Sequence, residues 1–264
     1  MKLELLHRPA VTTAKRVRLL FVHGISTGAW VWERSFLPYF AEHGYESFAL
    51  SLRGHGNSEG RDRIRDFSLG DFADDVAETV KKIGGDVVIV GHSLGGGVLQ
   101  NYIKRGGAAS GVVLLCSAPP HGLLRASTIM AARNPQLWNE LAKGFKRGLR
   151  TADLDIVEAG LFSEPPPPDI RRLLHDRFDD IAETASRQVI GWTPFAPFPW
   201  GMPKMLIIGG EKDEFVPASD VRLTAIYYGE RSLILPDGVH AIMMDRRWQE
   251  AAKPIAAWLD RNFS

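Results

Sequence analysis

The sequence Gly91-His92-Ser93-Leu94-Gly95 lies between an apolar run and a helix-like run, and the rest of the chain is interpreted around it. Residues 87–90 precede it with the composition of a buried strand, and residues 96–105 follow it with helical character. A serine between two glycines in this strand–turn–helix order is typical of a nucleophile on a sharp turn, where a Cβ at either glycine would meet backbone. We expect the backbone N–H of Leu94, at the helix start, to face developing negative charge.

Composition limits the class of protein. The chain has 264 residues, enough to bury a full core as one domain, and its 45% hydrophobic and 24% charged content is globular. Its 32 Lys and Arg residues nearly balance 31 Asp and Glu residues, so we expect no nucleic-acid partner. The single cysteine, Cys116, excludes an internal disulfide and lies in an apolar run, which indicates a buried hydrophobe rather than a catalytic thiol.

No segment of the sequence predicts secretion or membrane insertion. Residues 1–7 are too short and too charged for the apolar core of a signal peptide, and no apolar run approaches the length of a transmembrane helix. We therefore expect a soluble, cytoplasmic protein without a stable membrane anchor, either a monomer or a homodimer.

Two further turns follow predicted strands near the N-terminus. Residues 16–22 are expected to form a buried parallel strand that runs into His23-Gly24. Residues 45–50 are expected to form the next strand, which runs into the glycine-rich turn Arg53-Gly54-His55-Gly56-Asn57-Ser58. Residues 3–6 and 11–13 are interpreted as short edge strands.

These motifs together resemble those of the α/β-hydrolase fold family, and within it those of serine esterases, lipases and monoacylglycerol-lipase-like or lysophospholipase-like members. The resemblance covers residues 16–116 and 204–263. It implies an α/β fold with a mostly parallel, eight-stranded twisted sheet flanked by helices, and a helical cap inserted after the sixth strand. Strand–helix alternation breaks down from 119 to 202, so we expect a core of residues 1–118 and 203–264 and a cap of residues 119–202.

A serine hydroxyl is a weak nucleophile that needs an imidazole to take its proton, and the imidazole needs a carboxylate to fix its tautomer. The resemblance implies the chain order serine, acid, histidine for a triad beginning at Ser93. It identifies Asp213, in a G-x-x-D-x-x-V-P pattern, as the acid, and His240, in a G-x-H pattern, as the base. Glu214 and Asp220 are close alternatives in sequence, but Asp213 matches the spacing.

The resemblance also assigns supporting roles. It implies that the backbone N–H of Ile25 is the second oxyanion donor beside that of Leu94, that His23 braces this loop, and that His55 has a structural hydrogen-bonding role. The aromatic and apolar residues of the cap predict an acyl pocket, for which the candidate lining residues are His121, Trp30, Trp192 and Phe195.

We therefore expect a hydrolase of carboxylic esters that acts through an acyl-enzyme on a small-molecule substrate, namely a short- to medium-chain acyl ester or a monoacylglycerol-like lipid. Ser93 argues against haloalkane dehalogenase and epoxide hydrolase chemistry, because those enzymes of this fold use an aspartate at the turn. No cofactor or metal is implied. Four acidic residues, Asp74, Asp75, Asp179 and Asp180, are interpreted as solvated helix faces rather than metal ligands.

Two alternatives stay open at this point. The same triad also fits carbon–carbon bond hydrolysis, lactone hydrolysis or perhydrolysis, which the motifs do not distinguish. The other alternative is a ligand-binding or receptor protein that keeps the fold without turnover, which a complete triad disfavours.

Overall fold

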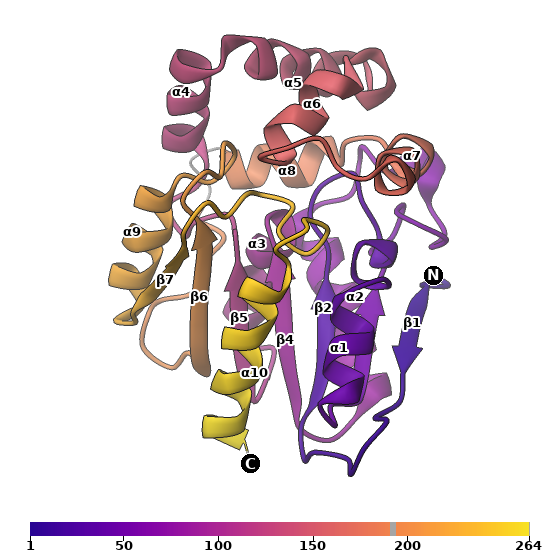
Figure 1. The fold of residues 1–264 in the computed structure, drawn as a ribbon, viewed down its shortest axis with the longest axis vertical. Helices are drawn as coiled ribbons and strands as arrows, with labels where there is room; N and C mark the ends of the chain where they lie inside the picture. The colour runs from indigo at the N-terminus through magenta and orange to yellow at the C-terminus, as the bar shows by residue number, and fades with distance from the viewer. Residues whose placement is uncertain (191–193, 264) are drawn as a thin grey trace.

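The computed structural model describes residues 1–190 and 194–263, and a sheet of seven strands lies at the centre of this part of the chain (Figure 1). The strand order is β1-β3-β2-β4-β5-β6-β7, in which β1 is antiparallel to β3 and every other pair is parallel. The strands are β1 Leu5–Arg8, β2 Arg18–Val22, β3 Ser47–Leu50, β4 Val87–His92, β5 Gly111–Leu115, β6 Lys204–Gly210 and β7 Ser232–Leu235. The predicted mostly parallel α/β sheet is confirmed.

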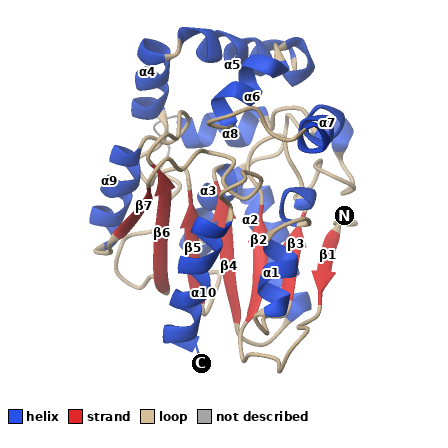
Figure 2. Cartoon of the chain, in the orientation of Figure 1, coloured by secondary structure: helices blue, strands red, loops and turns tan. Residues whose placement is uncertain are grey.

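Helices cover both faces of this sheet, which explains why its central strands are apolar throughout (Figure 2). Alternate residues of one strand enter different cores: Val88 and Val90 pack on one face, and Ile89 on the other. The first core is completed by helices α1 Phe36–Glu42 and α10 Gln249–Phe263. The second core is completed by helices α2 Leu69–Ile83, α3 Leu94–Lys104 and α9 Ala218–Tyr228.

The prediction of eight strands is wrong, since the part of the chain described by the structure pairs seven. Residues 11–13, which we interpreted as an edge strand, form bends instead. The N–H of Val11 donates to the carbonyl of Ala41 at 2.9 Å, and the Val11 side chain is 72% exposed, so this segment wraps onto α1 rather than onto a sheet edge. The cap insertion consequently follows the fifth strand in the chain, not the sixth.

The cap segment, residues 119–202, lies between β5 and β6 in the chain and beyond the carboxyl ends of the strands (Figure 1). Its helices are α4 Leu124–Arg133, α5 Pro135–Arg147, α6 Leu154–Leu161, α7 Pro168–Arg177 and α8 Glu183–Ile190. Backbone hydrogen bonds attach it to core loops, with Asp179 donating to Ser26 at 2.8 Å and Thr184 donating to Arg65 at 3.0 Å. The cap segment is therefore bonded to loops near the carboxyl edge of the sheet.

Short 3₁₀ helices are also present, at Ala29–Trp32, Arg61–Arg63 and Leu149–Thr151. Pro254 lies inside α10, which continues through it as one helix. Among the described helices, none combines the length and the apolar character needed to cross a membrane.

Candidate active site

Ser93 occupies the sharp turn between β4 and α3. Its backbone has φ 51° and ψ −119°, a conformation that non-glycine residues rarely adopt and that places strain at this position. The turn requires its glycines because a Cβ on Gly95 would lie 2.4 Å from the carbonyl oxygen of His23, and one on Gly91 would lie 2.8 Å from that of Gly95. The close approach of β2, β4 and α3 thus holds the Ser93 hydroxyl at the carboxyl edge of the sheet.

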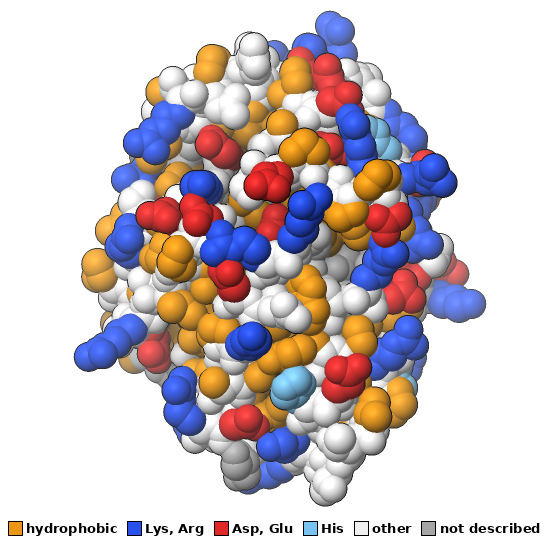
Figure 3. Space-filling model, in the orientation of Figure 1, with side chains coloured by type: hydrophobic (Ala, Val, Ile, Leu, Met, Phe, Trp, Pro, Cys, Tyr) orange, Lys and Arg blue, Asp and Glu red, His pale blue; other side chains and the backbone are white. Residues whose placement is uncertain are grey.

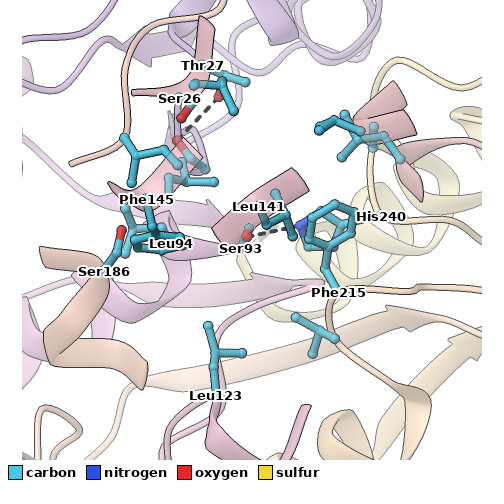
Figure 4. Close-up of a pocket in the computed structure, with 18 of the residues that line it drawn as sticks. Ser26, Thr27, Ser93, Leu94, Leu123, Leu141, Phe145, Ser186, Phe215 and His240 are labelled. Carbon is cyan, nitrogen blue, oxygen red and sulfur yellow. Dashed lines mark hydrogen bonds between the residues drawn. The ribbon is translucent and has the colours of Figure 1, made fainter. Parts of the chain in front are cut away.

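Ser93, His240 and Asp213 form a continuous chain of hydrogen bonds. The Ser93 Oγ atom lies 3.0 Å from His240 Nε2 (Figure 4). His240 Nδ1 lies 2.9 Å from the nearer carboxylate oxygen of Asp213. His240 and Asp213 are buried, and the backbone N–H groups of Phe215 and Val216 both donate to Asp213 Oδ1 at 2.8 Å. An ionised Asp213 takes the Nδ1–H of His240 and leaves the Nε2 lone pair for the serine proton.

Parallel strands bring these residues together from distant parts of the chain. Asp213 follows β6 and His240 follows β7, so both loops open at the same edge as the β4–α3 turn. The carboxylates considered as alternatives lie elsewhere: Glu214 is exposed, and Asp220 bonds to His121 Nε2 at 2.9 Å. The structure therefore assembles the three residues that the sequence singled out.

Three further residues hold this chain of hydrogen bonds in place. The Phe215 ring stacks on His240 with centroids 4.6 Å apart, and His92 Nε2 lies 2.9 Å from the His240 carbonyl oxygen, to which it donates. Burial lowers the pKa of His92 well below its ordinary value, so its ring is neutral. Burial likewise raises the pKa of the Cys116 thiol, whose Sγ atom lies within 4.8 Å of a carboxylate oxygen of Asp213. In the sequence, the one indication that His92 and Phe215 contact the candidate site is that they lie within two residues of Ser93 and Asp213, respectively.

Two backbone N–H groups belong to residues that line the cavity beside Ser93. Ile25 and Leu94 both line the cavity beside Ser93, and within the described part of the chain neither N–H donates to another protein group. The β2–α1 loop that carries Ile25 is shaped by Ser26, which has a positive φ of 58°. His23 braces this loop from a buried position, since its Nε2 accepts the Leu52 N–H at 3.0 Å.

The interpretation of Asp75 and Asp179 as solvated is wrong, because both are buried. Asp75 accepts from the guanidinium of Arg53 at 2.7 Å, and Asp179 accepts the N–H of Gly56 at 2.7 Å. These two carboxylates fix the glycine-rich loop that follows β3, and Asp179 does so from the cap segment. Asp74 and Asp180 are not buried, and Asp180 accepts the Leu149 N–H at 2.9 Å.

A cavity of about 400 Å³ opens at Ser93 and extends between the core and the cap segment. Figure 4 shows Leu94, Leu123, Leu141, Phe145 and Phe215 around the serine and histidine. Further apolar side chains from four cap helices complete the wall, namely Met130, Trp138, Val157, Leu161 and Leu174. The arrangement places the Ser93 hydroxyl and the His240 imidazole at the wall of a predominantly apolar space, a geometry that is suited to acyl transfer.

The predicted pocket residues are placed differently. His121 bonds to the buried Asp220, Trp30 is buried in the core within the first 3₁₀ helix, and Phe195 packs against Gly97 of α3. None of the three lines the cavity. Trp192 lies outside the described residues. Aromatic type alone did not distinguish residues that fill the core from residues that face the cavity.

The described residues contain one group of potential metal ligands, Cys116, Asp213 and His240, whose ligand atoms lie within 4.8 Å of one another. Asp213 and His240 already bond to each other, and burial raises the pKa of the Cys116 thiol.

Protonation of buried His55 is expected to make stability depend on pH. Burial lowers the pKa of His55 from 6.5 to about 4, so stability from its neutral ring is present above pH 6.5 and lost as pH falls towards 4. In His55→Asn the amide can replace the histidine as donor to the Arg53 carbonyl, and it does not titrate. As the pH is lowered over this range, the free energy of unfolding of the wild type should therefore fall by about 3 kcal/mol more than that of the variant. Urea unfolding at several pH values measures this, and an unchanged pH dependence would contradict it.

Comparison with known proteins gives matches along most of the chain. The sequence model of the alpha/beta hydrolase family matches residues 19–253. A non-heme haloperoxidase of Rhodococcus erythropolis is 32% identical over 137 residues, which are 50% of this chain and 47% of the relative. A bifunctional esterase/perhydrolase of Acinetobacter calcoaceticus is 33% identical over 109 residues, which are 39% of this chain and 37% of the relative. The chain thus matches at most about half the length of these curated relatives.

Solved structures resemble the whole chain at low sequence identity. An esterase from Exiguobacterium antarcticum superposes with a TM-score of 0.73 at 15% identity, covering 98% of this chain and 95% of the esterase. A monoacylglycerol lipase from Paleococcus ferrophilus gives a TM-score of 0.73 at 18% identity, covering 99% of this chain and 100% of the lipase. At these identities the likeness concerns the fold.

Proposed function

Because the chain belongs to the alpha/beta hydrolase family, we propose that it is a serine hydrolase that cleaves carboxylic esters through an acyl-enzyme. The observation that carries this proposal is the unbroken hydrogen-bond chain Ser93–His240–Asp213 at the wall of an apolar cavity. The fold likeness to solved esterases and lipases is consistent with it. A binding protein without turnover would have no need of this proton path.

In the proposed mechanism, Ser93 Oγ attacks the ester carbonyl carbon while His240 Nε2 takes the hydroxyl proton. The carbonyl oxygen becomes an oxyanion that accepts hydrogen bonds from the N–H groups of Ile25 and Leu94. The tetrahedral intermediate then breaks its bond to the alcohol oxygen, which leaves with the proton held by His240. Water, deprotonated by His240, attacks the acyl-enzyme, releases the carboxylic acid and restores Ser93. Asp213 orients His240 and stabilises its charged form.

We propose that the substrate is a short- to medium-chain acyl ester or a monoacylglycerol-like lipid. A volume of about 400 Å³ lies within the size range of small-molecule sites, and the apolar wall favours a hydrocarbon chain. Residues 119–202 would act as the cap that determines which acyl group fits. The cytoplasmic location and the monomeric or homodimeric state remain predictions.

A panel of p-nitrophenyl esters from acetate to palmitate tests the substrate class. We expect kcat/KM to rise with chain length and then fall once the chain exceeds the cavity. Val157→Phe, which adds an aromatic ring to the cavity wall, should move the optimum to shorter chains because it takes up volume there. Val11→Phe adds the same ring at an exposed site and should leave the optimum in place. A flat profile, or equal shifts in both variants, would contradict the proposed acyl pocket.

Perhydrolysis is the second candidate activity, because the sequence relatives include haloperoxidases and an esterase/perhydrolase. In this reaction hydrogen peroxide replaces water. His240 takes its proton, a peroxide oxygen attacks the acyl carbon, and the bond to Ser93 Oγ breaks as the serine recovers the proton and the peracid is released. The triad and the oxyanion donors serve unchanged. The test is to add hydrogen peroxide to the ester panel and to assay peracid. Peracid formation that depends on Ser93 would show perhydrolysis, and carboxylic acid as the one product would show hydrolysis alone.

A further inference from the structure

Phe198 and Trp200 project from the end of the cap segment that precedes β6, and they are 70% and 75% exposed. Their rings stack on each other with centroids 5.0 Å apart and an interplanar angle of 3°. Aromatic side chains of this size supply large amounts of apolar surface and are usually buried when a partner surface is available. Two such rings exposed side by side indicate an interaction surface for a protein, a membrane or a ligand.

The chain directly before these two rings is bonded to helices α3 and α9 of the core. Phe195 is 3% exposed, and its carbonyl accepts from Asn101 Nδ2 of α3 at 3.4 Å. The Tyr227 hydroxyl of α9 donates to the carbonyl of Pro197 at 2.9 Å. The exposure of Phe198 and Trp200 is therefore a property of an attached segment rather than of a loose end.

Helix α9 extends this surface with apolar side chains of its own. Leu223, Ile226 and Tyr227 are 41%, 74% and 39% exposed, and their spacing of three and four residues puts them on one side of the helix. We call these three residues together with Phe198 and Trp200 the aromatic face. Figure 3 shows hydrophobic side chains at the molecular surface over α9.

The exposed charges of the segments that carry or border the aromatic face are mostly positive. Residues 124–133, 194–204 and 218–231 contain five exposed cations, which are Arg125, Arg133, Lys204, Arg222 and Arg231, and one exposed acidic residue, Glu230. The other acidic residue of these ranges, Asp220, is buried and bonds to His121 and Arg125, so its charge does not face solvent. An apolar surface with aromatic rings and surrounding cations is complementary to an anionic lipid surface.

We propose that the aromatic face docks on an anionic lipid surface, with Phe198 and Trp200 entering the headgroup region. A second copy of the chain is a poorer partner, because a symmetric contact would bring Arg222 of each copy towards cations of the other. Docking involves α4, whose Arg125 bonds to Ser219 and Asp220 of α9 and whose Ser127 and Met130 line the cavity. Delivery of lipid esters to this cavity rests on the proposed function, whereas the docking itself does not.

Sedimentation with vesicles tests the docking in protein carrying Ser93→Ala, so that hydrolysis cannot alter the lipid. Vesicles of phosphatidylcholine with about one-third phosphatidylglycerol should bind the protein, and phosphatidylcholine alone should bind it weakly. The double substitution Phe198→Ser with Trp200→Ser should lower the partition coefficient at least about tenfold, and high salt should also lower it. Val11→Ser, at another exposed apolar site, should bind as the parent does.

Absence of binding to the anionic vesicles, or equal binding by the double variant, would overturn the proposal. So would light scattering that shows a dimer separated into monomers by the double substitution, since the face would then join two copies. Ester turnover by otherwise wild-type protein is measured separately. Failed docking with intact turnover rejects the lipid surface alone, and docking without turnover rejects the proposed hydrolase alone.

Discussion

Ser93→Ala is expected to reduce kcat for ester hydrolysis by about 10⁴- to 10⁶-fold, the largest effect among the substitutions considered. The substitution removes the atom that forms the acyl-enzyme, and His240 Nε2, 3.0 Å away, loses the hydroxyl that it would deprotonate. KM should change little, because the cavity wall and the N–H groups of Ile25 and Leu94 are untouched. Residual activity would come from water and the oxyanion donors.

Turnover of the best ester, together with labelling by a fluorophosphonate, measures this effect. Ser127→Ala is the matched control, since Ser127 is another serine of the cavity wall with no hydrogen bond to a histidine among the described contacts. The control should retain both turnover and labelling. If Ser93→Ala hydrolyses esters near the wild-type rate, Ser93 is not the nucleophile and the mechanism is wrong.

Asp213→Asn should lower kcat by about 10⁴-fold with little change in the fold. The N–H groups of Phe215 and Val216 both donate to Oδ1, so the asparagine oxygen must take that position. Its NH₂ group then faces His240 Nδ1, which becomes an acceptor and moves the ring proton to Nε2. In that tautomer the ring cannot accept the proton of Ser93.

The pH dependence of kcat and kcat/KM measures the role of this carboxylate. Glu214→Gln neutralises the adjacent carboxylate, which is exposed, and serves as the control that should behave as wild type. A loss of less than about tenfold in Asp213→Asn would show that another group orients His240.

Local turn chemistry explains why most of the candidate site could be predicted from the sequence. A Cβ at Gly95 would meet the backbone of Val22 and His23, and His23 begins the His23-Gly24 turn. The two motifs, at 23–24 and 91–95, are therefore in direct contact, and each restricts the conformation of the other. The loops of Asp213 and His240 follow recognisable strands, and parallel topology then brings their ends together.

The parts that sequence reasoning placed wrongly depend on contacts between distant residues. His121 bonds to Asp220, 99 positions away, and so turns from the cavity that its place in the sequence suggested. Asp179 is buried because Gly56, 123 positions away, donates to it. The prediction of a strand at 11–13 was wrong for a similar reason, since the N–H of Val11 donates to Ala41 of α1 instead of to a sheet edge.

The hydrogen bond from Asp179 to the Ser26 carbonyl makes the cap segment a structural part of the loop that carries Ile25. The same aspartate holds the glycine-rich loop through Gly56. The cap segment is consequently not an interchangeable module. Under the proposed mechanism, a chimaera that received residues 119–202 from another hydrolase would change the acyl specificity and would also disturb the loop of the proposed oxyanion donor Ile25, so even acetate esters would be turned over at a different rate.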